Sequence, residues 1–156
     1  MFSPYGNSIA TGGDDYFVRL WDANHGTDSK ATKPFLCPIS ALSWNAQGNL
    51  LAVAGTDNQM ALINTRPSLS LGRKFSGHSD CITALHFSHA TKHLISGSAD
   101  RTVRVWDIST SKEVKQIPVM SSVTCMDINH QDTVFASGHK SGDLRIYSMS
   151  TFEKTH

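Results

Sequence analysis

The chain has 156 residues, of which 39% are hydrophobic and 17% are charged, and this length is sufficient for one domain with a hydrophobic core. Its formal net charge is +1 and its lysines and arginines form no run, which excludes the electrostatic attraction needed to bind nucleic acid or an anionic membrane. No apolar segment approaches the length of a membrane span, so we expect no direct membrane insertion.

Strand-like segments follow one another along the chain. Alternating apolar and polar residues, closed by polar turns, occupy 9–22, 37–49, 51–64, 73–77, 81–93, 94–107, 113–117, 123–133 and 135–148. Turn signals recur about every 8 to 12 residues, and no helical periodicity lasts more than a turn. The sequence therefore predicts an all-β protein of short strands.

These segments repeat with a period of about 42 residues. "IATGGDDYFVRLWD" (9–22) aligns with "LISGSADRTVRVWD" (94–107). The strand-ending residues of the four copies, spaced by 42, 43 and 41, are Trp21, Ile63, Trp106 and Tyr147. The turns six places earlier hold Asp15, Asp57, Asp100 and, in the last copy, Ser141. The chain thus divides into units of about 1–36, 37–76, 77–117 and 118–156.

This period, with the pairs Gly77–His78 and Trp106–Asp107, resembles the WD40 repeat, in which each unit forms one four-stranded propeller blade. The resemblance implies a WD40 β-propeller fragment of about four blades, each with four antiparallel strands, that is not a closed ring by itself. Seven such blades would need about 300 residues, so we expect the chain to be a piece of a larger propeller. We also expect self-association through its uncovered strand edges.

The resemblance further implies a structural role for residues that could otherwise form a catalytic relay. In WD40 repeats the turn aspartate bonds the histidine of the Gly–His pair, which meets a hydroxyl and the tryptophan indole. In the third unit this structural network is His78, Ser96, Asp100 and Trp106. The earlier units keep only Thr11, Asp15 and Trp21, and Asp57. A serine relay needs an exposed hydroxyl beside an oxyanion hole, so we expect no catalytic residue and no enzyme activity.

Metal and cofactor sites are not predicted either. His86, His89 and His93 lie within eight residues, but a strand and its turn point such side chains in different directions. No cysteine or carboxylate nearby completes a set of four ligands. The sequence contains no phosphate-binding glycine loop and no nucleophile elbow. We therefore expect no bound metal and no cofactor.

A non-catalytic scaffold for protein–protein interactions is the function that follows. Propeller blades present loops on one narrow face, where protein partners or peptide motifs bind. The residues that we expect on this face are Tyr16, Phe35, Asn58, Asp80, Arg101, His139 and Lys140, and the same loops also carry Leu36, Cys81, Ala99, Met120 and Ser121. Aromatic and arginine side chains dominate interface energies, so Tyr16, Phe35 and Arg101, together with Lys140, are the strongest candidates.

Residues 75–148 also resemble the C-terminal propeller of autophagy-related protein 16-like proteins, through "FSGHSDCITALHF" and "LISGSADRTVRVWD". This second resemblance implies a role in autophagosome formation. The alternative is a generic WD40 adaptor in a ubiquitin ligase, a chromatin or histone complex, or an RNA-processing assembly. The three cysteines include no C-x-x-C pair and indicate a reducing compartment. The cytoplasm is the expected location, and the nucleus stays open.

Overall fold

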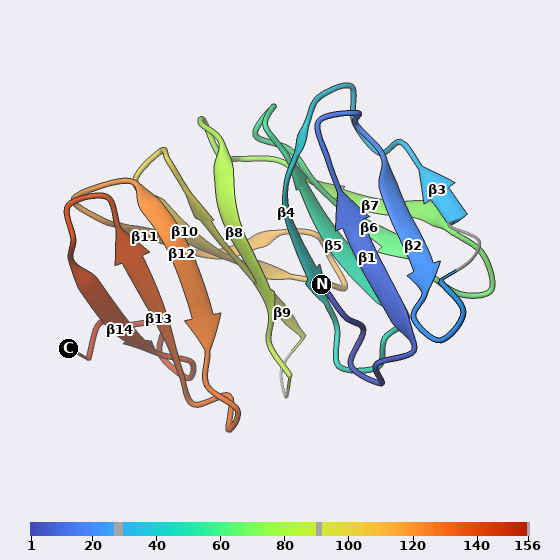
Figure 1. Cartoon of the computed structure of the whole chain (residues 1–156). Helices are drawn as coiled ribbons and strands as arrows, with labels where there is room; N and C mark the ends of the chain where they lie inside the picture. The colour runs from blue at the N-terminus through green and yellow to red at the C-terminus, as the bar shows by residue number, and fades with distance from the viewer. Residues whose placement is uncertain (27–29, 90–91, 156) are drawn as a thin grey trace.

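The computed structural model describes residues 1–26, 30–89 and 92–155, and within these ranges every regular element is a strand (Figure 1). The strands are β1 (Ser8–Gly12), β2 (Val18–Asp22), β3 (Lys30–Thr32), β4 (Ile39–Trp44), β5 (Leu50–Gly55), β6 (Met60–Asn64), β7 (Ser70–Phe75), β8 (Ile82–Phe87), β9 (His93–Ser98), β10 (Thr102–Asp107), β11 (Glu113–Pro118), β12 (Val123–Ile128), β13 (Val134–His139) and β14 (Leu144–Ser148). None of the described residues belongs to a helix capable of spanning a bilayer. The all-β prediction is confirmed.

The strands form four antiparallel sheets in chain order: sheet 1 (β1–β3), sheet 2 (β4–β7), sheet 3 (β8–β11) and sheet 4 (β12–β14). They stand side by side in an open arc, with sheets 1 and 4 at opposite ends (Figure 1). Sheets 2 and 3 have four strands each. Sheets 1 and 4 have three, and isolated bridges, Phe2 to Ile9 and Tyr147 to Lys154, stand beside them. The unclosed set of about four blades is therefore confirmed, with two blades one strand short.

In sheets 2 and 3 the turn between the second and third strands depends on one carboxylate, and so does its counterpart between β1 and β2 of sheet 1. Asp100 Oδ1 accepts the Thr102 N–H at 2.9 Å, and the aspartates of sheets 1 and 2 bond the residue two places on at 3.2 and 3.4 Å. The residue after each aspartate has a left-handed backbone: Tyr16 (φ 73°), Asn58 (φ 67°) and Arg101 (φ 65°). In sheet 4 the left-handed residue is Gly142 (φ 91°), which adopts this conformation without steric cost.

Each sheet has two chemically different faces, which we call forward (toward the next sheet) and back (toward the preceding sheet). Cross-strand pairs of small and aliphatic residues lie on the forward faces: Ala10–Leu20, Ala52–Leu62, Ile95–Val105 and Ala136–Ile146. Larger pairs lie on the back faces: Ile9–Trp21, Leu51–Ile63, Leu94–Trp106 and Phe135–Tyr147.

The hydrophobic core lies between the sheets, where a forward face meets a back face. Three clusters of buried side chains fill the three junctions. At the junction of sheets 2 and 3, Leu62 shares a cluster with Leu94 and Trp106. The sheets approach each other closely at glycines: a Cβ on Gly97 would lie 2.5 Å from the sulfur of Met126 in the next sheet.

Replacement of Gly97 by alanine tests this packing. Because the added methyl group meets both Met126 and, at 2.6 Å, a methyl group of Val123, we expect Gly97→Ala to lower the free energy of unfolding by about 1–3 kcal/mol. Gly13→Ala is the control, since its nearest contact would be Asp15 Oδ1 at 3.4 Å, and it should stay within about 0.5 kcal/mol of the wild type. Urea titration measures both, and equal losses would contradict close packing of the sheets.

Candidate functional site

Two kinds of loop build one narrow face of the molecule, the upper edge in Figure 1. One kind joins the second and third strands of a sheet, and the other connects one sheet to the next. Backbone hydrogen bonds hold the two kinds together in sheets 2 to 4. The N–H groups of Thr56, Ala99 and Lys140 donate to the carbonyls of Pro38, Cys81 and Ser122, respectively, at 3.0, 2.9 and 2.9 Å.

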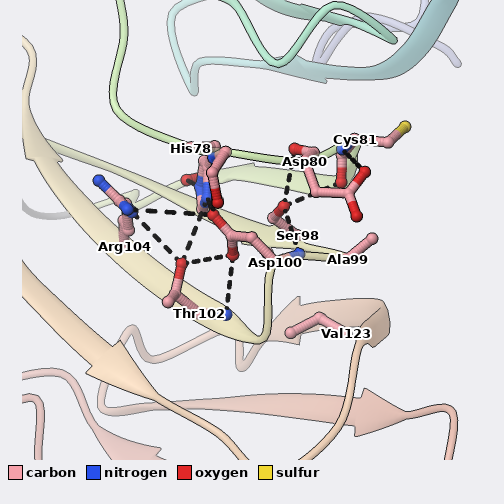
Figure 2. Close-up of polar contacts among 12 residues, drawn as sticks. His78, Asp80, Cys81, Ser98, Ala99, Asp100, Thr102, Arg104 and Val123 are labelled. Atoms are coloured by element: carbon pink, nitrogen blue, oxygen red, sulfur yellow. Dashed lines mark hydrogen bonds and ion pairs between the residues drawn. The ribbon is translucent and has the colours of Figure 1, made fainter.

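A buried network fastens this face in sheet 3 (Figure 2). His78 Nδ1 lies 2.7 Å from Asp100 Oδ2, and His78 Nε2 lies 2.7 Å from Ser96 Oγ. The indole N–H of Trp106 donates to the same serine oxygen at 2.8 Å. The side chains of His78 and Asp100 are 0% and 3% exposed. The structure therefore brings together the four network residues of the third unit.

The protonation states follow from these contacts. Burial lowers the pKa of His78 and outweighs the opposing hydrogen bond and charge of Asp100, so the ring is neutral. Burial acts to raise the pKa of Asp100, but hydrogen bonds from Thr102, His78 and the Ser79 N–H outweigh it and hold the pKa below its usual range. His78 Nδ1–H therefore donates a hydrogen bond to the ionised Asp100, and His78 Nε2 accepts a hydrogen bond from the Ser96 hydroxyl.

This arrangement leaves no reactive group for a substrate. The Ser96 hydroxyl is fully buried, and its oxygen already accepts the Trp106 N–H while its proton faces His78. A nucleophilic serine needs an exposed oxygen. The network therefore links the loop that carries His78 to the turn that carries Asp100 by hydrogen bonds.

A second serine, Ser98 at the end of β9, also holds this loop by hydrogen bonds. The Ser98 hydroxyl lies 2.9 Å from the carbonyls of both Asp80 and Cys81 and accepts the Asp100 N–H at 3.0 Å (Figure 2). Between sheets 3 and 4, the Ser122 hydroxyl donates to the Ala99 carbonyl at 3.1 Å. The backbone of the narrow face is thus held at several points.

The first two units keep only parts of the network. The Trp21 indole N–H donates to Thr11 Oγ1 at 2.9 Å in an exposed setting, and Asp15 pairs with Arg19 at 2.6 Å. Asp57 is exposed and holds its turn through the Gln59 N–H. The structure does not join these aspartates to the hydroxyl or indole groups of their own sheets.

The structure corrects the expectation that Phe35 and His139 are displayed on the narrow face. Both are buried: Phe35 is 5% and His139 6% exposed. Phe35 precedes the first strand of sheet 2 by four residues, as His78 precedes that of sheet 3, so its ring fills the place of the histidine with apolar contacts. His139 lies at the end of β13, where its ring lies 2.9 Å from the Ser137 hydroxyl and donates to the Ser121 carbonyl at 3.2 Å. Both side chains therefore stabilise loops from below.

The other expected residues lie in the loops of this face. Asp80, Arg101 and Lys140 are exposed, and Tyr16 and Asn58 are half-buried. The Lys33 ammonium group, which the sequence did not single out, lies 5.0 Å from the centre of the Tyr16 ring, within the range of a cation–π contact.

Two exposed apolar residues on the same face were also not among the strongest sequence candidates. Leu36 and Met120 are 84% and 80% exposed, and each stands three residues before the first strand of a sheet. The residue before each of them, Phe35 and Val119, is buried. The sequence places both residues in the loops of this face, and their exposure follows because a residue that follows a buried one in an extended loop points the other way.

The three histidines that cluster in the sequence have different surroundings in the structure. His86 Nδ1 lies 4.0 Å from Asp127 Oδ1. The rings of His93 and Phe152 meet edge to face, with their centres 5.5 Å apart. Within the described ranges, no group of three or more histidine, cysteine or acidic residues could hold a metal ion. His89 is exposed.

Comparison with known proteins decides the family. The family model described as "WD domain, G-beta repeat" matches residues 1–22, 69–107 and 112–148, more than half of the chain. The chain belongs to the WD40 repeat family. Residues 23–68, where Ile63 and Phe35 replace the tryptophan and the histidine of the motif, lie outside the matched segments.

Curated proteins with unrelated names are similar to this chain in sequence. It is 33% identical to the nuclear distribution protein nudF of Aspergillus niger over 78% of its length. It is 26% identical to the autophagy-related protein 16 of Arabidopsis thaliana over 97% of its length, and 25% identical to the human protein NEDD1 over 92%. The chain spans 28%, 30% and 22% of these relatives, respectively.

Solved WD40 structures share the fold. The WD40 repeats of RRP9 superpose with a TM-score of 0.89 at 17% identity, covering 99% of this chain and 48% of that chain. The structure of U3-55K gives a TM-score of 0.87 at 18% identity, covering 99% and 49%. At such identities the likeness concerns the fold.

Ser96→Ala tests the network. The substitution leaves the Trp106 N–H and His78 Nε2 without their buried partner, so we expect the free energy of unfolding to fall by about 1–3 kcal/mol. Thr11→Ala removes the equivalent bond to Trp21 in the exposed setting of sheet 1 and should cost less than about 0.5 kcal/mol. Denaturant titration compares the two, and equal effects would contradict the role of burial.

Acid should weaken the network. Because the pKa of His78 is lowered in the folded chain, the unfolded chain, with a histidine pKa of about 6.5, takes up a proton first as the pH falls. The contribution of His78 to stability is thus present above pH 6.5 and is lost as the pH falls through the folded pKa. We expect His78→Gln to flatten the decrease of stability between pH 7 and pH 5.

His86→Gln is the matched comparison for this measurement, because burial also lowers the pKa of His86. Each substitution should remove its own part of the pH dependence, as measured by thermal unfolding at several pH values. A wild-type chain that becomes more stable on acidification would contradict the assignment of a neutral His78.

Proposed function

We propose that this WD40 chain is a non-catalytic scaffold that binds protein partners or peptide motifs on its narrow face. The observation that carries the proposal is the exposure of Leu36 and Met120, 84% and 80%, on the same face as Arg101 and Lys140. Methionine, arginine and aromatic residues are enriched where proteins bind one another. The Tyr16 ring beside Lys33 adds an aromatic contact surface.

A rigid support favours this function over catalysis. The residues that could form a relay are occupied within the network below the face, and their bonds hold the loops that carry Asp80 and Arg101. A pre-formed loop surface loses little conformational entropy on binding. The net charge of +1 gives no support to nucleic acid as the partner.

We infer a role in autophagosome formation, as part of a protein similar to autophagy-related protein 16. The 26% identity to the Arabidopsis thaliana protein, over 97% of this chain, supports it. The alternative is an adaptor in another complex, which the 26% identity to the human F-box-like/WD repeat-containing protein TBL1X over 87% of the chain supports. We propose the cytoplasm as the location for the first role, and the adaptor role leaves the nucleus open.

Affinity capture from a cell extract tests the binding face. The wild-type chain and the variants Leu36→Glu, Arg101→Glu and Lys140→Glu are immobilised, and the retained proteins are quantified by mass spectrometry. We expect a shared set of partners to fall roughly tenfold or more with each variant, because truncation or reversal of an interface anchor costs at least about 1.4 kcal/mol. Autophagy proteins in this set would support the first role.

The controls are Lys92→Glu and Lys112→Glu, which lie in turns at the opposite ends of the strands. Each of these substitutions changes the net charge by the same amount as Arg101→Glu. Both lysines are exposed, so the changes do not disturb the core. Partners that are lost equally with the controls would show an unspecific charge effect and contradict the proposal. The proposal would also be contradicted if the amounts of retained partners were the same with Arg101→Glu and Lys140→Glu as with the wild type.

A further inference from the structure

A hollow opens between sheets 2 and 3, at the strand ends opposite the narrow face. Its walls come from residues 45, 47 and 50 of sheet 2 and from residues 87–89, 92 and 108–109 of sheet 3. The turns that follow β4 and β8 place it at the lower edge in Figure 1. Its volume is about 390 Å³, and ligand pockets in proteins typically have roughly 300–1,000 Å³. We call this hollow the lower pocket.

Apolar side chains that are only partly covered line the lower pocket. Leu50 and Ile108 are half-buried and pack against the core cluster between sheets 2 and 3. Phe87, a buried member of the same cluster, also lines the pocket. Sheets 2 and 3 each have a neighbouring sheet on both faces. The lower pocket is therefore a feature of an inner junction and not of an open end of the arc.

Backbone hydrogen bonds identify the equivalent place at the junction of sheets 3 and 4. In sheet 3 two bonds shape the turn after β10, with the donor–acceptor pairs Ile108–Lys92 and Ser111–Asp107, at 2.9 and 2.8 Å. In sheet 4 the same two bonds shape the turn after β14, with the pairs Met149–Thr133 and Phe152–Ser148, at 2.9 Å each. Ser111 and Phe152 also share a left-handed backbone, with φ of 59° and 56°. These two residues are therefore equivalent.

The aromatic ring of Phe152 occupies this place in sheet 4. It packs against the core cluster between sheets 3 and 4 and meets the ring of His93 edge to face. His93 is the first residue of β9, as Leu50 is the first residue of β5. Phe152 thus contacts the residue of sheet 3 that corresponds to Leu50 in the lower pocket. Sheet 3 has only the small side chain of Ser111 at the corresponding position, and the lower pocket is open.

Burial of the neighbouring apolar residue differs in the same sense. Met149, in the turn that carries Phe152, is 5% exposed, whereas its equivalent Ile108 is half-buried. An aromatic ring in the lower pocket would complete the burial of Ile108 and Leu50, and burial of apolar surface is favourable.

The exposed charged side chains at the lower pocket are cationic. Lys92 lines it, and the Arg73 guanidinium donates a hydrogen bond to the carbonyl of the lining residue Ser109. Among the described residues that line the pocket, none is acidic. The carboxylates of the adjoining turns, Asp107 and Asp132, already accept hydrogen bonds from turn residues, which leaves the two cations to face a ligand. A nearby negative charge on the ligand is therefore favoured.

We propose that the lower pocket binds an extended peptide segment of a protein partner, which inserts an aromatic side chain between sheets 2 and 3 and places a carboxylate near Lys92 and Arg73. The ring takes the position that Phe152 takes at the next junction. Aromatic side chains bury about 150–250 Å² each and act as interface anchors, while the carboxylate provides complementary charge. This site is separate from the narrow face and does not rest on the function proposed for that face.

Selection from a library of random peptides displayed on phage, with the whole chain immobilised, tests the proposal. Selected peptides are synthesised with a fluorescent label, and their dissociation constants are measured by anisotropy. We expect a family of peptides that share one aromatic residue and at least one aspartate or glutamate. Replacement of the aromatic residue by alanine should raise the dissociation constant roughly tenfold or more. Replacement of the acidic residue by lysine should raise it as well.

Ser111→Phe supplies from within the chain the ring that sheet 4 supplies with Phe152. The similar backbone of the two positions makes phenylalanine compatible with the turn, so thermal unfolding should show no loss of stability. The dissociation constant for the selected peptides should rise roughly tenfold or more, while the matched control Ser111→Ala should leave it unchanged. Lys92→Glu, at an exposed position where folding is not disturbed, should raise it roughly fivefold or more.

Arg101→Glu separates the lower pocket from the narrow face. It changes the net charge as Lys92→Glu does and should leave the dissociation constants unchanged. Three results would overturn the proposal. The first is a library that yields no peptide sensitive to Ser111→Phe or Lys92→Glu. The second is a set of peptides sensitive to Arg101→Glu alone, which would support binding at the narrow face. The third is a set of peptides that depend on the lower pocket but are basic or lack an aromatic residue.

Discussion

The packing of one sheet on the next is the constraint on which the whole molecule depends. A single twisted sheet of three or four strands cannot bury its apolar residues alone, so each sheet needs a neighbour on both faces. The forward faces offer small and aliphatic groups, such as Ala52 and Leu62, and the back faces offer large ones, such as Leu94 and Trp106. Each junction therefore packs the smaller side chains of one sheet against the larger side chains of the next.

The buried polar network is secondary to this packing, and each sheet solves the same local problem in its own way. Sheet 3 ties its loop with the ring of His78, while sheet 2 fills the same place with Phe35. Sheet 4 uses His139, which approaches from the end of β13 and bonds the Ser121 carbonyl. Polar bonding and apolar packing are thus interchangeable here, because each leaves no buried group unsatisfied at that place.

Rigid support from below gives the narrow face its significance for binding. The hydroxyl groups of Ser98 and Ser122 bond loop carbonyls, which leaves side chains such as those of Arg101, Leu36 and Met120 free to face solvent. Proteins whose names refer to nuclear distribution and to autophagy are similar to this chain in sequence. A shared framework with different exposed side chains is consistent with partners that differ from one protein to another.

The sequence by itself determined the repeat and the strand type, because these depend on local alternation and on turn aspartates at fixed spacing. The network of the third unit followed from the resemblance to the WD40 repeat. Asp100 and Trp106 could be placed from the 42-residue period alone. Only the tertiary structure decided that Phe35 and His139 are buried while Leu36 and Met120 are exposed. In an irregular loop the direction of a side chain depends on what lies beneath it, and that is supplied by residues distant in the sequence, which no local pattern records.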